Sequence, residues 1–276
     1  PMNTNAEAVR RPDVFPRAVS LLLNAAHAID HMFLLIFATA VATIAVEFGY
    51  STWTDLMPFG VGAFVLFGLG ALPAGRLGDL WGRRAMMIVF FFGMGAAALL
   101  VAATQNAWQL AAALTLLGAF AAIYHPVGIP MLVQHVSNPG AVIGINGLAG
   151  NLGIAGAALV TGFLVKWIGW RAAFAVPGIV CIGCGIAFAM VCPRESETPS
   201  QRKGGKAKVV LTPAMLVRAF TVMTVAAVAS SLIFNFTTNG NAQLLAEGFL
   251  GVVEDPALLG VMLAAIYATA SLAQIV

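Results

Sequence analysis

Long apolar runs, separated by short polar breaks, cover most of this chain. A helix needs about 20 residues to cross the hydrocarbon core of a bilayer. Eight runs are about that long, and they predict membrane-spanning helices at 18–46, 56–75, 85–104, 108–134, 141–165, 171–192, 214–236 and 257–276. Since backbone polar groups inside lipid must be paired internally, we predict an all-α protein that crosses the membrane several times.

The composition supports a membrane protein and excludes several other classes. Of the 276 residues, 60% are hydrophobic and only 9% are charged, whereas about a quarter of a soluble domain is charged. The net charge of +3 is too small to indicate a nucleic-acid partner. The sequence carries neither a nucleophile–base constellation nor a loop that would cradle phosphate, so we do not expect an enzyme.

One long polar segment interrupts the apolar runs. Residues 193–213 read PRESETPSQRKGGKAKVVLTP, a composition typical of a flexible linker. Six predicted spans precede this segment and two follow it. We therefore expect a six-helix bundle at 1–192, a linker at 193–213 and the start of a second, truncated bundle at 214–276. Two similar bundles joined in this way are typical of secondary transporters.

Basic residues are distributed unevenly between the predicted loops. With the N-terminus inside, the outer loops hold only Lys166 and Arg171, and twelve basic residues fall on the inner side: Arg10, Arg11, Arg17, Arg76, Arg83, Arg84, Arg194, Arg202, Lys203, Lys206, Lys208 and Arg218. The positive-inside rule therefore places the N-terminus and the linker in the cytoplasm. We expect a monomeric, multi-pass protein in the lipid bilayer of a bacterial inner membrane.

The break between the second and third spans, residues 75–84, reads GRLGDLWGRR. It resembles the signature loop of the major facilitator superfamily, G-x-L-x-D-R-x-G-R-R/K, although Leu80 stands where the family has arginine. The positions that match are Gly75, Leu77, Asp79, Gly82, Arg83 and Arg84. The resemblance implies an alternating-access transporter in which this cytoplasmic loop takes part in gating. Asp79 is expected to pair with Arg83 or Arg84, and the pair would break and reform as two bundles tilt.

Other segments add to this resemblance. GWRAAFAVPG (169–178) resembles the entry to the family's sixth helix, and LTLLGAFAAIYHPVG, which ends at Gly128, resembles its fourth-helix motif. The tripeptide YHP (124–126), together with a histidine in span one, is similar to the fosmidomycin-resistance type of efflux protein. That subgroup implies export of a small-molecule substrate.

Span five has glycine at every third position: Gly144, Gly147, Gly150, Gly153 and Gly156. Helix positions three apart form an inclined row, which glycines would turn into a shallow trough. A neighbouring helix could slide along this trough or pack tightly in it. Asn146 and Asn151 share the span, and either could face a central cavity. Asn151 is a candidate substrate contact, together with Asn235 and Asn239 of span seven.

Span one contains HAIDH, residues 27–31, within an otherwise apolar run. At 100° per residue, Asn24, His27 and His31 lie within about 60° of one another, and Asp30 lies about 60° beyond His27. A charge at mid-membrane costs several kcal/mol unless it is paired or faces a cavity. These four residues, with Tyr124 and His125 of span four, are therefore expected to line a path through the protein.

Three roles are open for this group of residues. The histidines and Asp30 could carry protons or contact substrate, they could form a structural hydrogen-bonded cluster, or His27, His31 and Asp30 could bind a metal. We take the first role, and so expect proton-coupled export of a small solute without a cofactor or a bound metal. An uptake symporter or facilitator of the same superfamily is an alternative, as is a membrane receptor or scaffold that does not transport.

Overall fold

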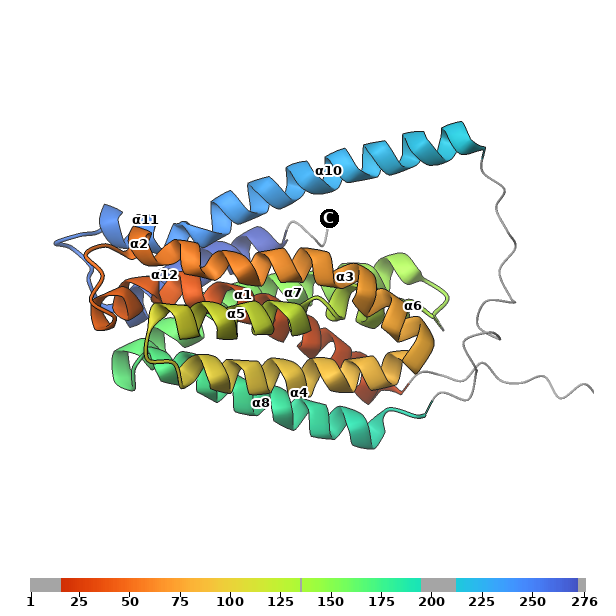
Figure 1. Ribbon diagram of the computed structural model, residues 1–276, viewed down its shortest axis with the longest axis horizontal. Helices are drawn as coiled ribbons and strands as arrows, with labels where there is room; N and C mark the ends of the chain where they lie inside the picture. The colour runs from red at the N-terminus through yellow and green to blue at the C-terminus, as the bar shows by residue number, and fades with distance from the viewer. Residues whose placement is uncertain (1–15, 135, 195–211, 273–276) are drawn as a thin grey trace, which may run out of the picture.

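The computed structural model describes residues 16–134, 136–194 and 212–272, and within these ranges the chain forms helices and turns without any strand (Figure 1). The α-helices are α1 (Arg17–Glu47), α2 (Trp53–Leu56), α3 (Val61–Trp81), α4 (Arg83–Ala102), α5 (Ala107–Ala121), α6 (Ile129–Val133), α7 (Pro139–Trp167), α8 (Trp170–Val191), α10 (Pro213–Asn239), α11 (Asn241–Gly248) and α12 (Pro256–Ser271). The predicted all-α membrane class is confirmed.

Seven helical segments of the described chain are long and apolar enough to span a membrane: Arg17–Glu47, Trp53–Trp81, Arg83–Ala102, Ala107–Val133, Pro139–Trp167, Trp170–Val191 and Pro213–Gly248. They correspond to the first seven predicted spans. The eighth corresponds to α12, which is 16 residues long as described. Most of the predicted linker, residues 195–211, lies outside the described residues.

The clearest difference from the prediction is at residues 75–84. Helix α3 continues to Trp81 and α4 begins at Arg83, so Gly75 and Asp79 are helical and only Gly82 lies between the helices. Gly82 has φ of 100°, a value that L side chains rarely adopt. A single glycine therefore reverses the chain, and the predicted loop is a helix–glycine–helix turn.

Helix α1 lies in the middle of the bundle and packs most extensively against α7 (Figure 1). Helix α7 also packs against α12, while α4 pairs with α8 and α3 with α5. The core between α1, α4 and α8 is apolar, with Phe33, Phe90, Phe91, Phe174 and Trp170 almost fully buried. The polar residues of α1 therefore stand out against an apolar surrounding.

The helices form two groups, α1–α8 and α10–α12, and α12 packs along α7 between them. At the Glu47 end of α1, the Nε1 of Trp53 donates to the carboxylate of Glu247 at 3.0 Å, and the Nε2 of Gln243 donates to the carbonyl of Ala38 at 3.0 Å. Toward its Pro213 end, α10 diverges from the other helices (Figure 1), and none of its residues is buried. The two groups are therefore held together at the Glu47 end, and α10 stands apart from the first group toward the Arg17 end.

Candidate functional site

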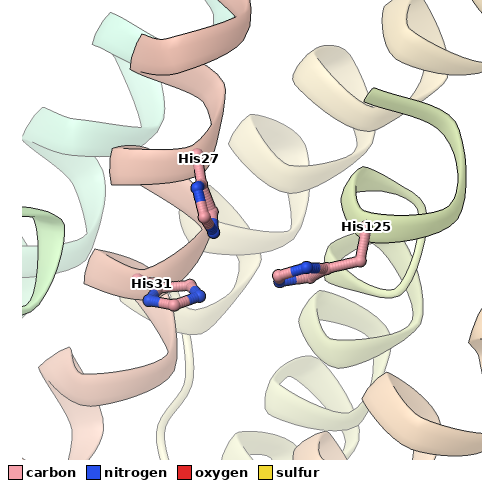
Figure 2. A group of neighbouring side chains, drawn as sticks. All are labelled: His27, His31 and His125. Carbon is pink, nitrogen blue, oxygen red and sulfur yellow. The ribbon is translucent and has the colours of Figure 1, made fainter. Parts of the chain in front are cut away.

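The polar groups predicted to line a path meet near the middle of α1. Three imidazoles from two helical segments gather there: His27, His31 and His125 (Figure 2). Their ring centroids are 4.6 Å apart for His27 and His31, 5.1 Å for His27 and His125, and 5.7 Å for His31 and His125. His27 is buried, whereas His31 and His125 are half-buried. We call these three residues the histidine cluster.

Asp30 lies beside the histidine cluster and is fully buried. Its Oδ2 is 3.6 Å from the Nε2 of His125. Neither carboxylate oxygen has a hydrogen-bond partner among the described residues. An ionised carboxylate in an apolar interior is costly without a positive partner. Asp30 therefore favours a proton or another cation at this position.

Asn146 of α7 holds the site together. Its side-chain amide donates to the Oδ1 of Asn24 at 2.9 Å and to the hydroxyl oxygen of Tyr124 at 2.7 Å. Its backbone carbonyl lies 2.7 Å from the Nδ1 of His27. Because a carbonyl only accepts, Nδ1 carries the proton, which leaves the lone pair of a neutral His27 on Nε2. The sequence pattern favoured Asn151 as the substrate contact, but Asn146 is the asparagine of α7 that is buried in the site. Asn151 is half-buried and takes part in none of these hydrogen bonds.

Tyr124 and His125 come from a π-helical turn, Tyr124–Gly128, between α5 and α6. Pro126 has no backbone N–H to donate, and π-turns often occur at functional sites. The turn presents two consecutive side chains to one site. Tyr124 stacks on His27 with centroids 4.8 Å apart, and His125 faces His31 and Asp30. The sequence pattern predicted both residues but not the π-turn that brings them together.

The predicted contacts from span seven do not reach the histidine cluster. The side-chain amide of Asn235 donates to the carbonyl of Ser231, and that of Asn239 donates to the carbonyl of Asn235, so both bond within α10. Phe234 is the residue of α10 that approaches, with its ring centroid 6.1 Å from that of His31. A single aromatic residue in an apolar helix gave no signal that it would face the site.

The predicted ion pair of Asp79 is absent from the part of the chain that the structure describes. Asp79 is exposed, and the ion pairs found there join other residues. Arg83 instead donates to the Oε1 of Gln134 at 2.9 Å, and Arg84 donates to the carbonyl of Cys192 at 2.8 Å. The two arginines thus connect the start of α4 to the C-terminal ends of span four and α8, where a helix dipole favours positive charge.

The five glycines of span five do not line one continuous trough. A Cβ at Gly153 would overlap the backbone of Ala28 in α1, and one at Gly150 would lie 2.7 Å from the ring of His27. Gly144 and Gly156 have nothing within 4 Å of such a Cβ. Since three residues turn through about 300°, a three-residue row drifts around the helix by about 60° per step. Gly150 and Gly153 therefore face α1, while other members of the row turn away from it.

We predict opposite effects of one substitution at two of these glycines. Gly153→Ala should destabilise the protein by about 1–3 kcal/mol, because the new methyl group meets backbone that cannot rotate away. Gly156→Ala, the matched control one turn further, should be neutral or stabilise by about 0.4–1 kcal/mol. Thermal unfolding of the purified variants measures both. Equal unfolding temperatures for the two variants would contradict the close contact between α1 and α7.

The histidine cluster is also the group of described side chains best placed to hold a metal. One ring nitrogen from each histidine lies within 4.8 Å of the other two. Imidazole nitrogen suits zinc, copper, nickel and iron, whereas magnesium and calcium prefer oxygen ligands. The donor set therefore fits a first-row transition metal.

Comparison with known proteins gives this site a family context. A family model described as Major Facilitator Superfamily matches residues 23–276. A protein named "Probable actinorhodin transporter" from Streptomyces coelicolor is 30% identical over 149 residues, which cover 52% of this chain and 26% of that protein. "Puromycin resistance protein pur8" from Streptomyces alboniger is 30% identical over 135 residues, covering 48% and 27%. The matched part spans about a quarter of the length of these relatives.

Solved structures show the same fold. A bacterial homologue of the human lysosomal transporter Spinster, in an inward-facing and unoccupied conformation, superposes with a TM-score of 0.72 at 15% identity, covering 92% of this chain and 60% of that one. A peptide transporter in complex with alafosfalin superposes with a TM-score of 0.52 at 17% identity, covering 85% of this chain and 48% of that one. At these identities the similarity concerns the fold alone.

Proposed function

The chain belongs to the Major Facilitator Superfamily, and from this premise we propose that it exports a small solute by alternating access, driven by protons that flow into the cell. The observation that carries the proposal is the fully buried carboxyl group of Asp30, without a hydrogen bond and beside the histidine cluster. A transporter that couples a proton flux to a solute flux needs a group that binds a proton in one conformation and releases it in another. A buried carboxyl group can do this, because its negative charge must be balanced by a cation.

We propose that residues 1–192 and 214–276 belong to two bundles that move against each other, with 193–213 as the linker between them. The Arg17 end would be cytoplasmic. Arg17, Arg83 and Arg84 start helices at that end, whereas Lys166 and Arg171 flank the turn between α7 and α8 at the other end. This distribution follows the positive-inside rule for an inner-membrane protein whose N-terminus is in the cytoplasm.

With this orientation, the cytoplasmic end is the one at which α10 stands apart from the first group of helices. A solute would enter between α10 and the first group of helices and reach the half-buried faces of His31 and His125. The contacts at the Glu47 end would then break while the Arg17 end closes, with Gly82 and its flanking helices at the moving cytoplasmic edge. Asn24, Tyr124 and Asn151 would lie along the solute path, and Asn235 and Asn239 would join it if α10 rotates toward the site.

Protonation would control which conformation is stable. A proton on Asp30 or on a histidine changes the charge at the centre of the protein, and a ligand shifts an equilibrium only by its different affinity for the two states. Proton binding from outside would favour release of the solute there. Export is the favoured direction because one Streptomyces relative is named a probable actinorhodin transporter and the other a puromycin resistance protein.

Flux measurements on the full-length protein in liposomes test this proposal. Under an imposed proton gradient we expect counter-transport of a suitable solute, with puromycin as the first one to try. The internal pH should change with solute movement, and a protonophore should abolish both. Solute flux that is independent of the gradient would favour a facilitator, and flux of protons and solute in the same direction would favour a symporter. No flux with any solute would favour the receptor or scaffold.

A further inference from the structure

We propose that His27, His31 and His125 form a binding site for a divalent first-row transition-metal ion, with zinc as the representative ion. The site lies within the transport path of the proposed function, and binding there is a property that can be tested without transport. The proposal rests on the positions of the ring nitrogens, the bonds that orient the rings, and the buried negative group beside them.

The three nitrogens are close enough to converge on one ion. They lie within 4.8 Å of one another, whereas two nitrogens bound to a tetrahedral zinc are about 3.3 Å apart, given Zn–N bonds of about 2.0–2.1 Å. His31 and His125 are half-buried, so their rings have room to turn and close this difference. Figure 2 shows His125 extending from the opposite segment toward the two histidines of α1.

One of the three imidazoles, that of His27, is oriented as metal ligands usually are. A ligating histidine commonly donates its second ring N–H to a carbonyl or a carboxylate, which fixes the tautomer and makes the other nitrogen a better ligand. The Nδ1 of His27 donates to the carbonyl of Asn146 at 2.7 Å. The Nε2 of His125 lies 3.6 Å from the carboxylate of Asp30. The Nε2 of His27 is therefore the free ligand atom of that ring.

Several buried polar atoms at the site have no partner among the described residues. Three side chains of α1 have buried atoms without a hydrogen-bond partner among the described residues: the Nε2 of His27, the Nδ1 of His31 and both oxygens of Asp30. Buried polar atoms in proteins are normally paired, and each exception calls for an explanation. One cation explains all of them, because it would take the imidazole lone pairs and balance the charge of Asp30.

The donor set selects the class of ion. Three neutral imidazoles with one open position match the ligand number of zinc sites in which water or a substrate takes the fourth place. Nitrogen donors discriminate against magnesium and calcium, which prefer oxygen. A bound ion would place two positive charges where a solute or a proton would otherwise bind. We therefore expect zinc to inhibit the proposed transport.

Binding is tested on the full-length protein, purified with an affinity tag that contains no histidine. Titration with Co²⁺ should give the visible absorption bands of a tetrahedral site and saturate at one ion per chain. Zn²⁺ should displace the Co²⁺, and Mg²⁺ should not. His27→Ala, His31→Ala and His125→Ala should each weaken Zn²⁺ binding by at least about 10–100-fold, and Asp30→Asn by about 10-fold or more. His135→Ala, which changes the remaining histidine of the sequence, is the matched control and should bind as the parent does.

Two results would overturn the inference: no saturable binding of Co²⁺ or Zn²⁺ by the parent protein, or equally tight binding by a variant that lacks all three histidines. Where an alanine variant fails to fold, the corresponding glutamine variant replaces it, and thermal unfolding without metal shows which variants qualify. The inference and the proposed function fail separately. Transport in metal-free buffer tests only the function, and metal binding in detergent tests only the site.

Discussion

Asp30→Asn should abolish gradient-driven transport without making the protein less stable. Asparagine has almost the same shape as aspartate but cannot take up a proton or balance a cation. A charge at this depth costs several kcal/mol when it is unbalanced, and each 1.36 kcal/mol changes a rate tenfold. The gradient-driven flux should therefore fall by about 100-fold or more. Since the carboxylate accepts no hydrogen bond from the described residues, its replacement breaks none there.

Three measurements on Asp30→Asn separate coupling from a structural role. Solute exchange without a proton gradient should persist, because the solute path and the contacts between the two groups of helices are unchanged. The unfolding temperature should stay the same or rise, since a buried charge is removed. Asp55→Asn, at an exposed carboxylate of α2, should transport as the parent does. A fall in the unfolding temperature together with the loss of exchange would show that Asp30 holds the fold and does not couple the fluxes.

The class of protein and most of its spans could be predicted from the sequence because they depend on long stretches. A run of about 20 apolar residues has few structural solutions in a membrane. The face of α1 that carries Asn24, His27 and His31 followed from helical geometry alone, and these residues do gather at the site. Tyr124 and His125 of span four are predicted to line the path together with this face, and both contact the histidines of α1.

Features that depend on one residue or one tertiary contact could not be predicted in this way. Asn146 and Asn151 are five positions apart in the same helix, and only the packing of α7 against α1 decides which one enters the site. The helix–glycine–helix turn at Gly82 depends on a single φ angle. The π-turn at Tyr124–Gly128 shifts the register within span four, which an assumed α-helical period cannot show.

The close contact between the two groups of helices depends on two facing glycines. Gly162 of α7 and Gly260 of α12 lie so close that a Cβ at Gly162 would be 3.1 Å from the Cα of Gly260. Such small residues let two helices approach closely in a membrane. The ion pair between Lys166 and Asp255 lies just beyond this crossing. The hydrogen bond from Lys166 lowers the pKa of the Asp255 carboxyl below its ordinary value.

Gly162→Leu should hold the Glu47 end open and stop the transport cycle. The new side chain meets backbone of α12, at a cost of about 1–3 kcal/mol to the closed contact. A coupling energy of that size shifts the ratio of closed to open states by about 5- to 150-fold. A cysteine placed at Leu263, which is buried and lines the cavity between α1, α7, α11 and α12, reports this shift. In a background without the three native cysteines, an impermeant thiol reagent should label it faster in Gly162→Leu.

Gly156→Leu is the matched control, since that position of α7 has nothing within 4 Å of an added Cβ. It should leave both the labelling of the Leu263→Cys reporter and the solute flux close to those of the parent. Unchanged labelling and flux in Gly162→Leu would show that this crossing does not close and open during transport. Faster labelling with unchanged flux would instead show that the crossing opens but that another step limits the cycle.

Because Asp30→Asn leaves this crossing intact, it should lose coupling without a change in labelling. The two variants therefore separate the proton step from the movement of the bundles.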